Sequence, residues 1–218
     1  MKERNLPATL FNFLKDVTFW NPKYCRTCSR CTMNRTCIEN FIEHVTTIRL
    51  KCPELLTDCW WAGKPFQCCD GFRPIDTEYG TCFVFNSALT SNDTTLVVNR
   101  NVGLPKLVFT AKEYVYLRVH SPYDRVSVAL ENPLGSNYLL IPDTDFDVIL
   151  KAEETISGVS VRSLPQDLRG CLYENERPTF AEQWPFKEYT NSACMLYCRG
   201  MAQVHICNCT HHFMPRLG

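Results

Sequence analysis

The sequence predicts an α+β fold of the disulfide-rich kind found outside the cell. Three observations predict this class: 14 cysteines in 218 residues, helical apolar spacing in both the first and last quarters, and alternating strand patterns between them. Helices and mainly antiparallel strands that occur in separate runs are typical of the α+β class. A hydrophobic content of 45% is too high for a disordered chain, and the length suits one domain or two small ones.

Helices are expected in three places. Apolar side chains recur at spacings of three and four between residues 38 and 48, which predicts a helix that packs on its own domain. Pro53 suits the first turn of a short helix that runs to Asp58. Thr190 or Asn191 can cap a longer helix that runs to about Val204.

The middle of the chain is expected to form mainly antiparallel strands. Cysteines and aromatic residues crowd together from Cys59 to Asn86, and the last six of these residues are predicted to form a strand. Apolar and polar side chains then alternate, as in half-buried strands, at residues 115–119, 126–130 and 146–152, with Val159 and Val161 beyond them.

The cysteine content indicates an oxidising compartment, where thiols form disulfides. Three Asn-x-Ser/Thr sequons agree with this compartment and make Asn34, Asn92 and Asn208 candidates for glycosylation. Lys plus Arg and Asp plus Glu both count 23, so the net charge is zero. Because nucleic-acid binders usually carry a basic excess, we expect no nucleic-acid partner.

Two pairs of cysteines near the end of the chain lie side by side. Cys194 and Cys198 are one helical turn apart and point outward, so they are poorly placed to bond to each other. Cys207 and Cys209 point to the same side if their segment is extended. Both pairs are therefore predicted to bond to an adjacent segment.

The cysteine counts also indicate that some disulfide partners lie outside the 218 residues. Nine cysteines lie in the first 82 residues and five in the last 48, and both numbers are odd. The first residues make a poor secretory signal, and no apolar run reaches the ~18 residues of a membrane span. We therefore expect the chain to be an excerpt of a longer, exported polypeptide.

No residue pattern predicts catalysis or a cofactor. Ser121, His120 and Asp124 could be drawn as a triad, but they are adjacent in one segment without a nucleophile elbow, so we expect no enzyme. Three histidines near Cys207 and Cys209 suggest a zinc site: His205, His211 and His212. Disulfides explain those cysteines better, and Cys-x-x-Cys knuckles do not recur, so we expect no metal.

Several motifs together resemble the extracellular region of degenerin/epithelial sodium channels, most closely the insect pickpocket branch. The first are Cys59-Trp60-x-x-Gly63-x-x-x-x-Cys68-Cys69-x-x-Phe72-x-Pro74 and Thr77-Glu78-Tyr79-Gly80-x-Cys82-Phe83-x-Phe85-Asn86-Ser87. The later ones are Arg169-Gly170-Cys171-Leu172-Tyr173, Tyr189-x-x-x-x-Cys194-x-x-x-Cys198-Arg199, Cys207-x-Cys209 and Phe213-Met214-Pro215-Arg216. The blocks stand in the family's order and span about residues 36 to 218.

The resemblance implies a subunit of a trimeric channel, with a hand-shaped ectodomain between two membrane helices. Residues 1–58 then correspond to finger helices, 59–170 to palm, β-ball and knuckle, and 171–218 to the start of a cysteine-rich thumb. The implied function is sodium transport across the plasma membrane by an amiloride-sensitive-type, ligand-gated channel. Its extracellular part is present here, and the pore is not. The alternatives are a secreted, disulfide-rich binding protein and a non-functional truncated product.

The resemblance also divides the cysteines. It implies partners outside this chain for six of them: Cys82, Cys171, Cys194, Cys198, Cys207 and Cys209. Cys59–Cys68 is the implied internal disulfide, and Cys52–Cys69 would enclose it. The remaining four, whose pairing stays open, are Cys25, Cys28, Cys31 and Cys37.

Carboxylates in residues 143–147 and at Glu153 and Glu154 fall in the implied β-ball. In acid-sensing relatives, pairs of carboxylates share protons and couple pH to gating. A solvated loop is the favoured interpretation of these residues, and proton sensing is the alternative.

Overall fold

A computed structural model describes residues 49–90, 96–128, 130–135, 138–151, 153, 156–181, 183–208, 210 and 214. The chain forms two compact units. The first consists of Met1–Pro122 and Val126–Pro142, and the second of Tyr123–Arg125 and Asp143–Gly218. Helices and antiparallel strands together confirm the predicted α+β class.

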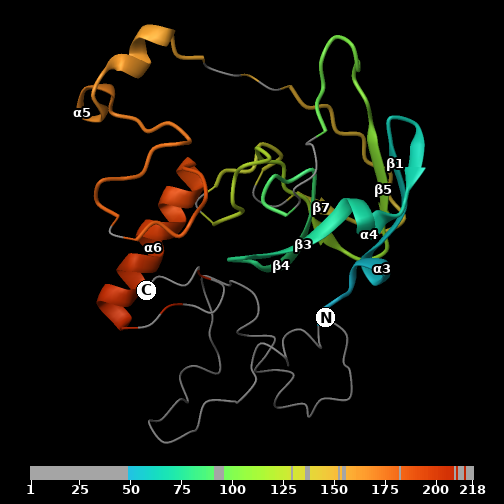
Figure 1. Cartoon of the computed structure of the whole chain (residues 1–218). Coiled ribbons are helices and arrows are strands. Elements are labelled where there is room, and N and C mark those ends of the chain that lie inside the picture. The colour runs from blue at the N-terminus through green and yellow to red at the C-terminus, as the bar shows by residue number, and fades with distance from the viewer. Residues whose placement is uncertain are drawn as a thin grey trace, which may run out of the picture. The chain divides into compact units, whose positions relative to one another are not determined.

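A three-stranded antiparallel sheet organises the first unit (Figure 1). Its order is β2 (Lys64–Phe66), β1 (Leu56–Trp61) and β5 (Leu107–Ala111). Ala62 and Gly63 join β1 to β2 with φ angles of 51° and 76°, the left-handed conformation that tight hairpin turns need. Helix α3 (Cys52–Leu55) leads directly into β1.

A hairpin of β3 (Phe72–Thr77) and β4 (Gly80–Phe85) follows the short helix α4 (Cys68–Gly71). At its turn, the Thr77 hydroxyl donates to the Gly80 carbonyl at 2.8 Å and accepts from the Tyr79 backbone N–H. A further pair, β6 (Val115–Tyr116) and β7 (Leu139–Leu140), is antiparallel as well.

Two disulfides and an aromatic cluster form the core of the first unit. Cys52 bonds to Cys69 and Cys59 to Cys68, with Cα–Cα distances of 5.7 and 5.2 Å, so that one bridge encloses the other in sequence. These are the two pairs that the resemblance implies. Leu56 and Phe72 are buried beside them.

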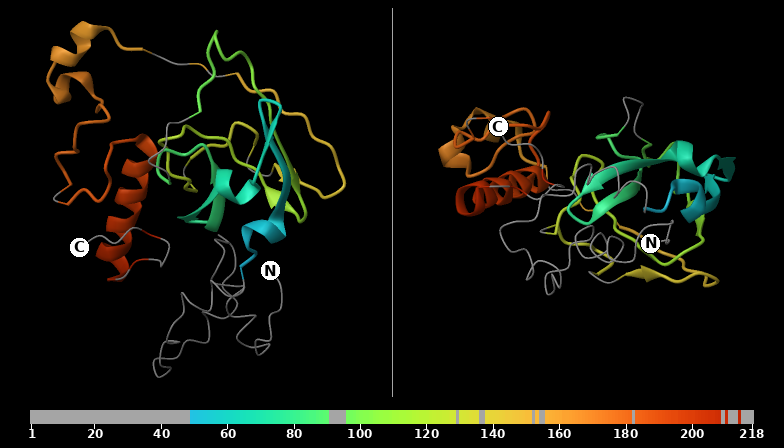
Figure 2. Two further views of the ribbon diagram at one scale, coloured as in Figure 1. Left: turned by 45° about the vertical axis from the view of Figure 1, so that its right-hand side comes forward. Right: turned by 90° about the horizontal axis from the view of Figure 1, so that it is seen from below.

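The second unit has a separate core around α6 (Asn191–Cys207), which follows the 3₁₀ helix η2 (Val159–Ser163) and α5 (Gln166–Arg169) along the chain (Figure 2). The buried side chains of this core are Phe186, Ala193, Leu196, Tyr197 and Met214. Trp184 packs against this core, with its ring 5.0 Å from that of Phe186 and 5.5 Å from that of Tyr197.

Several predicted elements differ from the observed ones. The helix expected from Pro53 to Asp58 ends at Leu55, because the following residues pair with β2 and β5 as strand β1. The boundary placed after residue 58 therefore falls inside a strand. The helix predicted at residues 38–48 lies outside the described residues.

Three predicted strands are short or absent among the described residues. Within 115–119, strand β6 covers only Val115 and Tyr116. In the described part of 126–130, the Val128 N–H donates to the Glu78 carboxylate and the Leu130 N–H to the Ser127 carbonyl, so these residues form no ladder. The described part of 146–152 is exposed and irregular, and Val159 and Val161 lie in η2. An alternating apolar and polar sequence forms a strand only where a second strand is present to pair with it.

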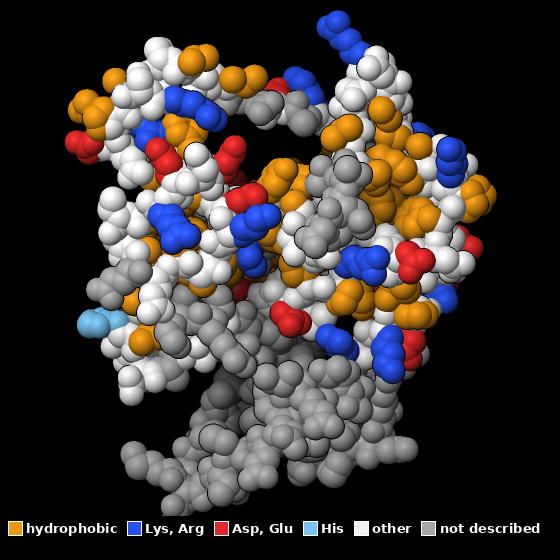
Figure 3. Space-filling model, viewed as in Figure 1, with side chains coloured by type: hydrophobic (Ala, Val, Ile, Leu, Met, Phe, Trp, Pro, Cys, Tyr) orange, Lys and Arg blue, Asp and Glu red, His pale blue; other side chains and the backbone are white. Residues whose placement is uncertain are grey.

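Part of the first unit's surface is apolar. Figure 3 shows hydrophobic side chains gathered over β1, β5 and the loop before β5. The exposed residues in this region include Trp60, Val102, Leu104 and Val108.

Candidate functional site

The first turn of α6 holds a polar network that lies within the second unit. Thr190, one of the two predicted caps, is the N-cap residue, and its hydroxyl accepts from the Ala193 N–H at 3.1 Å. Ser192 is the second residue of the helix and has an exposed fraction of only 3%. A hydroxyl buried so deeply needs hydrogen-bond partners.

The segment Tyr123–Arg125 supplies those partners. The Ser192 hydroxyl donates to an Asp124 carboxylate oxygen at 2.7 Å and accepts from the Arg125 N–H at 2.9 Å. Since its single proton goes to Asp124, the Thr190 hydroxyl 2.9 Å away is the donor of that contact. The Asp124 carboxylate also suits the positive end of the helix dipole.

Arg125 fixes the other end of the same segment. Its guanidinium lies 4.5 Å from the centre of the Phe186 ring, within the range of a cation–π contact. Burial lowers the pKa of Arg125 from its ordinary high value. We name these residues, Asp124, Arg125, Thr190, Phe186 and Ser192, the α6 anchor.

The thiols of α6 lie on its less buried side. Cys198 is exposed and Cys194 half-buried, and both are free, as is the exposed Cys171. Partial burial and the neighbouring Cys194 raise the pKa of the Cys198 thiol. Partial burial and contact with Cys194 also raise the pKa of Tyr189, so these groups are protonated at neutral pH. Met195 and Met201, both more than 40% exposed, accompany the thiols.

The end of α6 corrects one prediction. The helix extends to Cys207, three residues beyond Val204, because Asn208 adopts the left-handed conformation that ends it, with φ of 53°. Cys207 is therefore helical and not part of an extended pair with Cys209. The side chain of Cys207, and Cys209 itself, lie outside the described residues.

Cys82 is the fourth free thiol among the described cysteines, and it lies in strand β4 of the first unit. Burial raises its pKa, an effect partly opposed by the Thr77 hydroxyl 3.4 Å away and by Arg118. That its partner, and those of the α6 thiols, lie in another segment stays a prediction.

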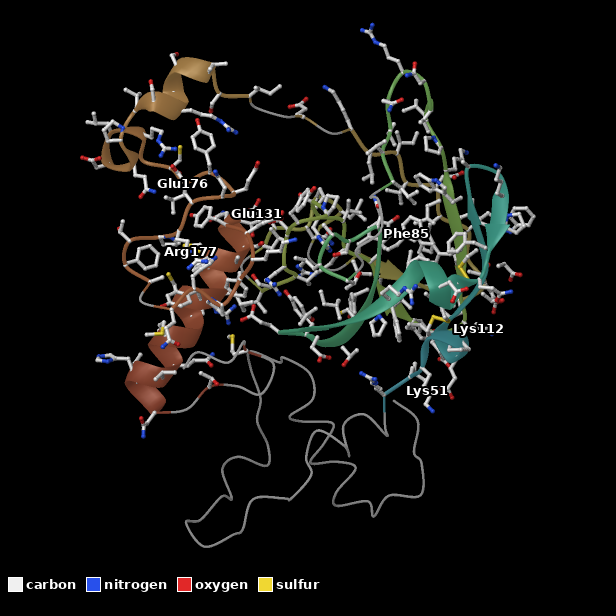
Figure 4. The ribbon with its side chains drawn as sticks, viewed as in Figure 1. Lys51, Phe85, Lys112, Glu131, Glu176 and Arg177 are labelled. Atoms are coloured by element: carbon white, nitrogen blue, oxygen red, sulfur yellow. A yellow bond between two sulfur atoms is a disulfide. The ribbon has the colours of Figure 1, made fainter. Side chains whose placement is uncertain are left out.

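Contacts around Tyr173 order the segment between α5 and α6. Arg169 Nη2 donates to Glu176 Oε1 at 2.6 Å, and Glu176 Oε2 accepts from the Tyr173 N–H (Glu176 is labelled in Figure 4). The bond from Arg169, then that from Tyr173, lowers the pKa of Glu176. The guanidiniums of Arg162 and Arg169 each lie 4.7 Å from the Tyr173 ring.

The remaining predicted site residues are scattered or not described. Outside the description lie Cys25, Cys28, Cys31, Cys37, Asn34, Asn92, His211, His212 and Glu154. Asn208 is exposed at the end of α6. Glu153 pairs with Lys151 at 2.7 Å, and Asp143, Asp145 and Asp147 are exposed. The residues considered as a triad do not assemble, because His120 Nδ1 contacts the Ser121 carbonyl and Asp124 is bonded to Ser192.

Sequence reasoning missed the α6 anchor. Asp124 and Ser192 are 68 residues apart, and no spacing rule connects them. The described residues contain no cluster of three or more metal ligands, and none of their helices has the length and apolarity to cross a bilayer.

The fold is a disulfide-stabilised α+β module, and comparison with known proteins gives its family. Residues 4–218 match the family model described as the amiloride-sensitive sodium channel, so the chain belongs to this family. The resemblance to degenerin/epithelial sodium channels is thereby confirmed. No solved structure matches the chain.

Insect channel proteins are among the relatives. "Sodium channel protein Nach" of Drosophila ananassae is 26% identical over 195 residues, which cover 85% of this chain and 36% of that protein. The Nach protein of Drosophila virilis is 26% identical, covering 79% and 46%, respectively. "Pickpocket protein 19" of Drosophila melanogaster is 25% identical, covering 73% and 35%. The chain thus spans less than half the length of these relatives.

Proposed function

We propose that this chain is the extracellular part of a sodium-channel subunit at the plasma membrane. The match to the channel family over residues 4–218 carries the proposal. Sodium ions would pass through a pore formed by several subunits, three by the family resemblance, and built from parts of the longer subunit. The regions 1–58, 59–170 and 171–218 would be finger, palm with β-ball, and the start of the thumb.

The exposed side of α6 supports the thumb assignment. Two thiols one turn apart, with Met195 and Met201 beside them, form a surface that could receive a second helix or strand. Cys194 and Cys198 would each form a separate disulfide with a cysteine of that segment. The apolar side chains would be covered at the same time.

The α6 anchor suggests how a movement of the thumb is passed on when a ligand gates the channel. Pro122 and Val126, which flank the segment Tyr123–Arg125, belong to the first unit, whereas the segment itself belongs to the second. Because Ser192 holds this segment through two hydrogen bonds, a displacement of the first turn of α6 would pull on both flanks. The anchor is thus proposed as a coupling point, and Asp124 and Ser192 as its positioning residues.

Current recording and surface labelling test this proposal. The gene that encodes the chain is expressed in cells, intact cells are stained with an antibody raised against the 218 residues, and sodium currents are recorded. We expect surface staining, an amiloride-blocked sodium current, and a shifted stimulus dependence for Ser192→Ala. Ser121→Ala is the matched control, since its side chain is exposed. Secretion of the chain without current would contradict the proposal.

A further inference from the structure

We propose that residues 143–150 of a second copy dock into the apolar groove beside β5, so that neighbouring subunits join head to tail. The proposal rests on the multi-subunit assembly put forward above and assigns the surfaces that carry it. It joins two features that the proposed gating role leaves unused. One is the groove, and the other is the acidic segment, residues 143–150.

The groove is apolar on a sheet face where polar side chains are normal. It measures about 660 Å³, and its lining includes Trp60, Val102, Leu104, Pro105, Lys106 and Val108. Trp60 lies opposite Pro65 of β2 and Val108 of β5, so all three share one face of the sheet. Leu104 is 90% exposed. Contiguous exposed apolar surface of this kind marks an interaction site.

Side-chain and backbone hydrogen bonds order the loop that lines the groove. The Asn86 side chain donates to the Leu96 carbonyl at 2.9 Å and accepts from the Leu96 N–H at 2.7 Å. The Asn99 side chain accepts from the N–H groups of Asn101 and Val102. The Ala62 N–H donates to the Lys106 carbonyl at 3.1 Å and so joins the β1–β2 turn to the residue before β5. A preformed surface loses little conformational entropy on binding.

Charge indicates which occupant fits. Residues 59–67 and 96–111, which build the groove, contain Lys64, Arg100 and Lys106 and no carboxylate. All three basic side chains are exposed. The occupant should therefore combine carboxylates with apolar side chains.

The acidic segment has this chemistry. Residues 143–150 carry Asp143, Asp145 and Asp147 and no basic side chain, and every one of them is exposed. Ile149 is 96% and Leu150 54% exposed, although they are large and apolar. The segment belongs to no helix or strand, so it can be bound in an extended form.

Such a contact is heterologous, because a groove on one copy receives a segment of the next. Contacts of this type close into rings when the rotation between copies permits it. The groove and the acidic segment thus provide complementary surfaces for a ring of subunits.

Charge exchange tests the docking. Analytical ultracentrifugation follows the association of the 218-residue chain after its free thiols are capped with N-ethylmaleimide. We expect concentration-dependent association that Lys106→Glu and Asp145→Lys each weaken about five- to tenfold, with recovery in the double variant. Arg73→Glu, an equal change at another exposed basic position, should have no effect.

A wild-type chain that stays monomeric at several times the concentration used for the variants would overturn the docking, as would a double variant that does not recover. A synthetic peptide of residues 142–151 gives a second readout, since it should compete with association and alter the fluorescence of Trp60. Failure to compete would also overturn it. Neither result depends on sodium current, so the docking can fail while the channel assignment stands.

Discussion

The segment Cys52–Phe72 and helix α6 use their cysteines in opposite ways. In the first, four cysteines lie within 18 residues and bond to one another, and the core closes over them. In the second, Cys194 and Cys198 stay free while the opposite side of the helix is buried around Leu196 and Tyr197. In the first region, disulfides within the region itself stabilise the core. Helix α6 is stabilised instead by its N-cap and its aromatic core, so its two thiols remain available to bond to another segment.

Removal of the Cys59–Cys68 bridge is expected to have the largest effect. A disulfide restricts the unfolded chain, so Cys59→Ser together with Cys68→Ser should lower the free energy of unfolding by about 3 kcal/mol. Urea denaturation followed by tryptophan fluorescence measures it. Cys198→Ser, at an exposed free thiol, is the matched control and should change little.

Ser192→Ala should have the next largest effect. It leaves the Asp124 carboxylate and the Arg125 N–H without their partner, which should cost about 1–2 kcal/mol of unfolding free energy. Thermal denaturation of Ser192→Ala and of the control Ser121→Ala, measured side by side, gives the contribution of the α6 anchor to stability. Equal thermal unfolding midpoints for the two variants would mean that the Ser192 hydrogen bonds do not stabilise the anchor and would contradict its proposed coupling role.

Arg125→Met should have a smaller effect, about 1 kcal/mol, because it loses the cation–π contact with Phe186 while keeping an apolar stem there. The unfolding free energy in urea again measures it. Arg177→Met, at an exposed arginine, is the control. A loss no greater than that of the control would mean that the ring contact contributes nothing.

The smallest effect concerns pH. Because the pKa of Glu176 is lower in the folded chain than in the unfolded one, its bond to Arg169 stabilises the fold above the ordinary glutamate pKa of about 4.3. That stabilisation is lost as the pH falls through the lowered value. Glu176→Gln should reduce the fall of the unfolding free energy between pH 5 and pH 3. Urea titrations at intervals of about 0.5 pH unit would measure this change. An unchanged slope would mean that Glu176 is not the group concerned.

Structural features could be predicted from the sequence where neighbouring residues determine them. The cap at Thr190 and the strand ending at Phe85 follow from neighbouring residues, and both were predicted closely. The motif of paired cysteines implied both bridges through the family resemblance. The turn that Ala62 and Gly63 form between β1 and β2 also has a local cause, although it was not predicted from the sequence.

Long-range contacts were not predictable from spacing. Residues 126–130 alternate like a strand, yet Glu78, some 50 residues earlier, accepts the Val128 N–H in place of a neighbouring strand. Ser192 and Asp124 meet only through the fold. The end of α6 was missed because Asn208 ends the helix by adopting a left-handed conformation, which the sequence did not reveal.

Assignment of the free thiols tests the division of the cysteines most directly. The native chain is alkylated, unfolded, alkylated with a second reagent, and mapped by mass spectrometry. We predict that Cys52, Cys59, Cys68 and Cys69 take neither reagent. Cys171 and Cys198 should take the first, while Cys82 should react slowly, because burial raises its pKa. A disulfide that joins two of the six cysteines predicted to have outside partners would contradict the account: Cys82, Cys171, Cys194, Cys198, Cys207 and Cys209.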